Sequence, residues 1–317
     1  MTTNLLGNVL LLSVAFLVLA KSVSMFINSS TKIARRFKLS GYTISFLLIG
    51  TATSLPELVV GITSAINKTP MLSYANVMGS NMALLTLIVA LPVMLGAHIS
   101  TRHIIQSKDL YISIFFFVST LALTIDGKLT RADGVILIAG YLIYTVSILK
   151  KGSNVEKFVD SLGQINIWKQ AVIFVISLLL LIGSSEMIVK LAISISDILR
   201  WRLVFVGVSI TALGTSLPEI VHALKVMNNP WQKEGILGNI MGSVVTNSSL
   251  VLGVTSLITP ISINSGNINV PTLTILVTTL LLFLFFARTK NKLEKFEAVA
   301  LIAIYVIFLS LEYILTV

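Results

Sequence analysis

Two glutamates, Glu57 and Glu219, lie inside long apolar stretches, and each ends an identical motif, TSLPE. An ionisable side chain inside a membrane-spanning segment is costly and usually marks an ion pathway or an ion-binding site. Hydroxyl side chains precede each carboxylate. They belong to Thr53 and Ser54 in the first copy and to Thr215 and Ser216 in the second. Hydroxyl and carboxylate oxygens are the ligands that hard cations such as Ca²⁺ prefer. The two motifs therefore indicate an all-oxygen cation site.

The proline of each motif adds backbone oxygens to this set. Pro56 and Pro218 lack an amide hydrogen and clash with the carbonyl four residues back, which frees the regions of Ala52 and Gly214. Free carbonyls at membrane depth are tolerated only where they are buried in protein or line a wet cavity. The structural alternative is a simple kink with each glutamate paired to a basic group, but no basic residue occurs at a matching position in both copies. Two unpaired carboxylates repel each other, so a bound divalent cation or protonation must relieve the repulsion.

A second pair of motifs, NVMGS and NIMGS, ends at Ser80 and Ser243, whose hydroxyls can face the same site. Their glycines, Gly79 and Gly242, are expected to allow close approach of neighbouring helices.

The downstream residues of the two copies differ. Asn247 follows Ser243 by four residues and therefore lies on the same helix face, where its amide oxygen can bind a cation. The matching residue of the first copy is Leu84, which cannot coordinate anything. The site is therefore expected to be asymmetric.

The composition places these motifs in a membrane. The chain has 317 residues, of which 55% are hydrophobic and only 11% charged, and its mean hydropathy is +0.95. A soluble domain carries about 25% charged residues, and apolar runs of about 18 or more residues can cross a bilayer. The net charge of +10 comes from residues between the apolar runs, which fits the positive-inside rule better than nucleic-acid binding. The absence of cysteine excludes disulfides and thiolate metal sites.

The pattern predicts an all-α membrane protein with ten transmembrane helices. Their expected ranges are 4–27, 39–66, 70–97, 109–126, 131–149, 169–192, 203–228, 234–260, 269–287 and 294–316. Most Lys and Arg residues fall on one side of these spans, which places that side in the cytoplasm and both termini outside.

The repeated motifs divide the chain into residues 1–150, a cytoplasmic linker at 151–168, and residues 169–317. Five spans in each half give the two copies opposite orientations across the membrane. Such inverted repeats are typical of secondary transporters, which bind their substrate near the bilayer midplane at the repeat interface, in broken helices.

These motifs resemble those of the cation/calcium antiporter superfamily, most closely the prokaryotic sodium/calcium exchangers. The resemblance rests on G(T/S)SxPE followed by GSxxxN/D about 27 residues later, and it covers nearly the whole chain. It implies that Glu57 and Glu219 bind Ca²⁺ and Na⁺, and that the first and sixth helices slide to give alternating access. It further implies hydroxyl, carbonyl or amide ligation from Thr53, Ser54, Thr215, Ser216, Ser80, Ser243 and Asn247, and from the backbone of Gly50 and Ala212.

The expected activity is exchange of Ca²⁺ for Na⁺ without a cofactor, by an integral protein of a prokaryotic plasma membrane. Its expected partners are these ions and the lipid bilayer, with no nucleic acid and no obligate protein partner. Leu84 offers no oxygen ligand and Asn247 offers only a neutral one. H⁺-coupled exchange of Ca²⁺ or another divalent cation therefore remains an alternative. An intramembrane enzyme and a passive channel fit less well, because protease and phosphatase signatures are absent and an inverted repeat is not typical of a symmetric pore.

Four other polar residues lie in or near the predicted spans. His222 follows Glu219 by one helical turn, where it either tunes that carboxylate or serves in helix packing. Glu186, Lys190 and Glu312 lie near span ends or on outer helices, where snorkelling or pairing between helices is expected.

Overall fold

The computed structural model describes residues 5–36, 54–101, 108–151, 166–228, 235–263, 270–289 and 292–316. Helices occur in each of the ten predicted ranges. They are α1 (Leu5–Arg36), α3 (Leu55–Ile66), α4–η2–α5 (Pro70–Ala83, Leu84–Ile88, Val89–Met94), α7 (Lys108–Leu123), α8 (Arg131–Lys151), α9 (Ile167–Leu199), α10–η4–α11–α12 (Leu203–Val206, Gly207–Thr211, Ala212–Thr215, Leu217–Val226), α13–η5–α14 (Gly235–Thr246, Asn247–Val251, Leu252–Ile258), α15 (Val270–Arg288) and α16 (Lys295–Thr316).

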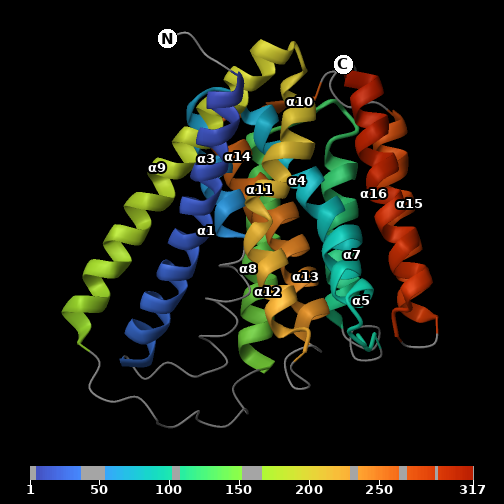
Figure 1. Cartoon of the computed structure of the whole chain (residues 1–317), viewed down its shortest axis with the longest axis horizontal. Helices are drawn as coiled ribbons and strands as arrows, with labels where there is room; N and C mark the ends of the chain where they lie inside the picture. The colour runs from blue at the N-terminus through green and yellow to red at the C-terminus, as the bar shows by residue number, and fades with distance from the viewer. Residues whose placement is uncertain are drawn as a thin grey trace.

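Several of these helices are long and apolar enough to cross a bilayer. Among the described residues, five meet that test, and a sixth is added if the bent pair Leu203–Thr215 and Leu217–Val226 counts as one span. Shorter apolar helices cover Leu55–Ile66, Leu110–Leu123 and Thr274–Arg288. α1 begins and α16 ends at the same end of the bundle (Figure 1), as an even number of crossings requires.

Two helix ends were predicted wrongly. α1 continues to Arg36 rather than ending near residue 27, and α9 continues to Leu199 rather than 192. Hydropathy detects only the part of a helix that lies in hydrocarbon, about 20 residues. A helix of 32 or 33 residues is longer than that. Its polar end remains helical because the backbone hydrogen bonds continue outside the apolar layer.

The two halves repeat the same irregularities. The segments η2 and η5 are π-helical turns that begin at Leu84 and Asn247, four residues after the two GS motifs. π-helical turns inside α-helices frequently occur at functional sites. The equivalence predicted from the two sequence motifs is therefore also present in the backbone.

Short strand pairings show the same repetition. β1 (Lys128–Leu129) pairs antiparallel with β2 (Ile261–Ser262), so that Lys128 lies opposite Ser262. A separate bridge joins Ser100 to Lys292. Lys292 follows Lys128 by 164 positions, and Ser262 follows Ser100 by 162, so the two pairings exchange partners between the repeats. Each pairing joins a loop of one half to a loop of the other.

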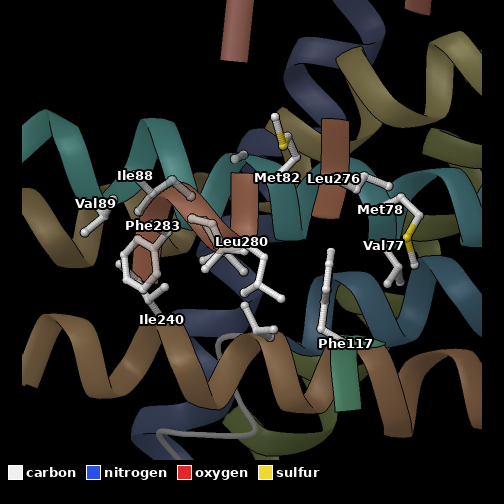
Figure 2. Close-up of a cluster of buried hydrophobic side chains, with 14 of the residues drawn as sticks. Val77, Met78, Met82, Ile88, Val89, Phe117, Ile240, Leu276, Leu280 and Phe283 are labelled. Atoms are coloured by element: carbon white, nitrogen blue, oxygen red, sulfur yellow. The ribbon is translucent and has the colours of Figure 1, made fainter. Parts of the chain in front are cut away.

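The hydrophobic core lies between the helices that carry the motifs and the outer helices. Figure 2 shows this cluster, in which α15 packs its side chains against α4, η2, α5, α7 and α13. Its labelled members are Val77, Met78, Met82, Ile88, Val89, Phe117, Ile240, Leu276, Leu280 and Phe283. Most of these side chains are less than 2% exposed, so this part of the bundle is a fixed support for the motif helices.

The helices α1 and α9 form a separate pair at one edge of the bundle (Figure 1). Asn8 donates a hydrogen bond to the Ser194 hydroxyl at 2.8 Å, and the rings of Phe26 and Phe174 lie 4.9 Å apart. The Phe16 ring packs against Gly214, where an added Cβ would lie 2.2 Å from the ring atoms. The pair is thus bound together and touches the core beside the second TSLPE motif.

Candidate cation site

The helix break predicted at Pro218 is present. α11 ends at Thr215 and α12 begins at Leu217, with a bend of 40° between the two segments. Pro218 stands in the first turn of α12, and Pro56 stands in the first turn of α3. Glu57 and Glu219 therefore lie in first helical turns, where the unpaired amide groups and the helix dipole favour negative charge.

Glu57 lies at the contact between the two repeats and is only 1% exposed. Its Oε1 accepts a hydrogen bond from the Ser80 hydroxyl at 3.2 Å and another from the Ser216 hydroxyl at 3.4 Å. Ser80 belongs to the same repeat and Ser216 to the other, so one carboxylate oxygen joins the two halves. The second oxygen, Oε2, is buried and has no hydrogen-bond partner among the described residues.

Glu219 is 2% exposed and close enough to Glu57 for the two carboxylates to repel each other. Neither of its side-chain oxygens has a hydrogen-bond partner of regular geometry in the described part of the chain. The Ser243 hydroxyl interacts with this carboxylate, as Ser80 does with Glu57. The structure thus brings both glutamates and both GS serines together.

Thr215 and Ala212 complete the second-repeat side of the site. The Thr215 hydroxyl lies 3.3 Å from the Ala212 carbonyl oxygen and 3.5 Å from the Ser80 hydroxyl. Ser80 also lies 3.4 Å from the same carbonyl. The Ser54 hydroxyl is buried and lacks a partner among the described residues. Two predicted members, Thr53 and Gly50, lie outside the described residues.

Asn247 is fully buried, as a ligand at this position requires. Its Oδ1 has no hydrogen-bond partner in the described segments. Leu84, which occupies the matching place in the first repeat, is 1% exposed and belongs to the hydrophobic cluster of Figure 2. It contributes no side-chain oxygen, so the two repeats place different chemical groups at this matching position.

Two amide residues of the site were missed in the sequence. Asn76 Oδ1 accepts a hydrogen bond from the Thr215 hydroxyl at 3.2 Å, and Asn81 Oδ1 accepts one from Asn247 Nδ2 at 3.2 Å. Asn76 opens the NVMGS motif and Asn81 directly follows it. The available signal was an amide one helical turn before the predicted ligand Ser80 and a second amide directly after it.

The close helix approach predicted at Gly79 is present. A Cβ there would lie 2.3 Å from the Val208 carbonyl oxygen, so only glycine allows α4 to approach η4 this closely. The repeat equivalence pairs Gly242 with a segment near residue 46, which lies outside the described residues. Its role in helix approach stays a prediction.

The remaining polar candidates have structural partners or lie apart from the site. Glu186 accepts a hydrogen bond from Asn67 at 3.1 Å and forms an ion pair with Lys190 at 3.0 Å. Glu312 accepts a hydrogen bond from Thr272. Pairing between helices, one of the two predicted outcomes, is therefore confirmed for Glu186 and Glu312. His222 is only partly buried on α12, and its tuning role stays a prediction.

Comparisons with known proteins show the family to which the chain belongs. A family described as sodium/calcium exchanger protein matches residues 7–150 and 169–314. The chain therefore belongs to the sodium/calcium exchanger protein family, and the resemblance inferred from its motifs is confirmed. The two matched segments show that the family's sequence pattern occurs twice in the chain.

Particular relatives span almost the whole chain. The putative antiporter CaxA of Alkalimonas amylolytica is 26% identical over 310 residues, covering 95% of this chain and 96% of the relative. The sodium/calcium exchanger MaX1 of Methanosarcina acetivorans is 25% identical over 349 residues, covering 97% and 98%. A solved structure of the sodium-calcium exchanger NCX_Mj has a TM-score of 0.64 and 24% identity, covering 97% of this chain and 99% of that one. This likeness shows that the two chains share a fold.

Proposed function

We propose that this chain is a secondary-active antiporter that exchanges Ca²⁺ for Na⁺ by alternating access. One observation carries the proposal: four buried acceptor oxygens without hydrogen-bond partners of regular geometry among the described residues lie on the two central helix pairs. They are Glu57 Oε2, Glu219 Oε1, Glu219 Oε2 and Asn247 Oδ1. Buried acceptors without partners are costly, and a cation bound between them would satisfy all four.

The charge of the site suits one divalent cation. Two carboxylates neutralise one Ca²⁺, which takes about 6–8 oxygen ligands in proteins. Serine hydroxyls and the Ala212 carbonyl add neutral oxygens nearby, and the predicted members Thr53 and Gly50 would add more from the first repeat. Na⁺ ions entering the same oxygens would compete with Ca²⁺, which is the coupling that exchange requires. Family membership and the sodium/calcium exchanger MaX1 support this choice of ions.

The membrane setting forms part of the same proposal. We expect both termini outside a prokaryotic plasma membrane, and two repeats at 1–150 and 169–317 with a cytoplasmic linker at 151–168. The chain would act as a transporter rather than an enzyme, with ions as substrates, no cofactor and no obligate protein partner.

The test is Na⁺-driven uptake of ⁴⁵Ca²⁺ into proteoliposomes that contain the full chain. Glu57→Gln and Glu219→Gln are each expected to reduce uptake to that of protein-free liposomes, because one carboxylate cannot neutralise Ca²⁺. Glu294→Gln is the matched control, since Glu294 pairs with Lys292 at 3.3 Å in the loop before α16, away from both motifs. Uptake at the level of the unmutated protein by either site variant would overturn the proposal.

Exchange coupled to H⁺ is the second candidate, favoured by the apolar packing of Leu84 and the neutral Asn247. It predicts ⁴⁵Ca²⁺ uptake driven by a pH gradient in the complete absence of Na⁺. Uptake that requires Na⁺ and ignores the pH gradient would exclude it.

A further inference from the structure

Asn247 lies in a chain of hydrogen bonds that crosses the interface between the repeats. Its Nδ2 group donates to Asn81 Oδ1 at 3.2 Å, and Asn81 Nδ2 in turn donates to the Ser248 hydroxyl at 2.9 Å. All three side chains are fully buried. The Oδ1 atom of Asn247 is left without a partner among the described residues.

The two ends of an amide side chain differ in what they can bind. The oxygen accepts hydrogen bonds or coordinates a cation, whereas the NH₂ group only donates. Rotation by half a turn would present the NH₂ group to a cation, which it repels. A glutamate or aspartate has oxygen at both positions and needs no such control. A neutral asparagine is therefore a dependable ligand only when something fixes which end faces the ion.

Asn81 supplies that control. Its Oδ1 atom accepts from the NH₂ group of Asn247, and its own NH₂ group donates to the Ser248 hydroxyl. With Asn81 in this orientation, rotation of Asn247 alone would place two amide oxygens against each other in a buried site, at the cost of an unmade hydrogen bond. The Asn247 oxygen is thereby turned away from Asn81.

We propose that Asn81 is a positioning residue that makes the neutral Asn247 a cation ligand. This inference rests on the proposed function and deepens it. The first repeat has no oxygen at Leu84, but through Asn81 it determines the orientation of the corresponding ligand in the second repeat. At this position the second repeat would then supply the ligand, Asn247, and the first repeat would supply the residue that orients it, Asn81.

A simpler account would give Asn81 a role in helix packing alone. Ser73 provides the comparison, because its hydroxyl lies 2.9 Å from that of Thr255 and also joins α4 to the second repeat. Both Ser73 and Asn81 are fully buried on α4. The Ser73 contact, however, involves none of the proposed ligands.

The test is calorimetric titration of the purified full chain with CaCl₂ in Na⁺-free buffer, repeated with competing Na⁺. Asn81→Ala is expected to weaken Ca²⁺ binding about fivefold, the ratio that corresponds to loss of one buried hydrogen bond. In an Asn247→Asp background the same substitution should change the dissociation constant less than about twofold, because either carboxylate oxygen can face the ion. Ser73→Ala measures the effect of losing a packing contact.

The outcomes separate the two proposals. An unmutated chain that binds neither Ca²⁺ nor Na⁺ would overturn the proposed function and the inference together. If that chain binds Ca²⁺ but Asn81→Ala matches Ser73→Ala, or loses equal affinity in both backgrounds, only the inference fails. Should Asn81→Ala not fold, Asn81→Asp decides, since aspartate still accepts from Asn247. Retained binding supports the positioning role, and lost binding in a folded protein contradicts it.

Discussion

The Ser216 hydroxyl of the second repeat donates a hydrogen bond to Glu57 Oε1 of the first repeat, over 3.4 Å. The contact places the break in one repeat's helix directly against the carboxylate of the other. Neither motif therefore makes a site by itself, because each supplies the hydrogen-bond partner or the charge that the other half needs.

Replacement of Ser216 by alanine should loosen Glu57 without removing its charge. We expect Ca²⁺ affinity to fall roughly fivefold, since a long hydrogen bond to a carboxylate contributes about 1 kcal/mol. Binding to the purified protein measures the effect. Ser249→Ala is the control, because that hydroxyl donates only to Val245 O in its own helix. Equal affinity in the two variants would show that Ser216 does not orient Glu57.

Leu84→Asn should restore an amide where the first repeat has an apolar side chain. We expect tighter Ca²⁺ or Na⁺ binding, together with a lower free energy of unfolding by about 1–3 kcal/mol, because a polar group enters a packed cluster. Leu85 is also 1% exposed, but its side chain points in another direction around the same π-helical turn, so Leu85→Asn should show only the loss of stability. Unchanged affinity in Leu84→Asn would mean that this position does not face the ions.

Gly79→Ala should separate α4 from η4 because the new Cβ would meet the Val208 backbone at 2.3 Å. Overpacking of this kind costs about 1–3 kcal/mol, and here it also moves Ser80 away from Glu57. The midpoint temperature of thermal unfolding and the rate of ⁴⁵Ca²⁺ uptake should both decline. Gly183→Ala in α9 is the control, because the described structure leaves free space for the added methyl group. This variant should keep both its unfolding temperature and its uptake. A fully active Gly79→Ala protein would contradict the tight approach.

Much of this arrangement could be predicted from residue types and spacing. The broken helix of the second repeat followed from Pro218, and the membrane class followed from composition, because both depend on local chemistry. The partners of Asn81 could not be predicted in this way, since they lie on a helix more than 160 positions away. Which oxygens remain free of hydrogen bonds depends on side-chain orientation, which sequence spacing does not contain. The ends of α1 and α9 were missed because hydropathy locates the apolar part of a helix and not the residue at which its backbone hydrogen bonding ends.

The strand pairings of Lys128 with Ser262 and of Ser100 with Lys292 have a mechanical consequence. They join the repeats through loops that the predicted topology places on opposite membrane faces, and neither involves α1 or α9. The other helices would thus be held to one another at both faces. Movement of the α1–α9 pair against them would have to break contacts such as the hydrogen bond from Asn67 to Glu186. Since the chain has no native cysteine, a disulfide between cysteines introduced at Lys128 and Ser262 tests this directly. Exchange should survive that cross-link. Loss of exchange would mean that the two repeats must move relative to each other during transport.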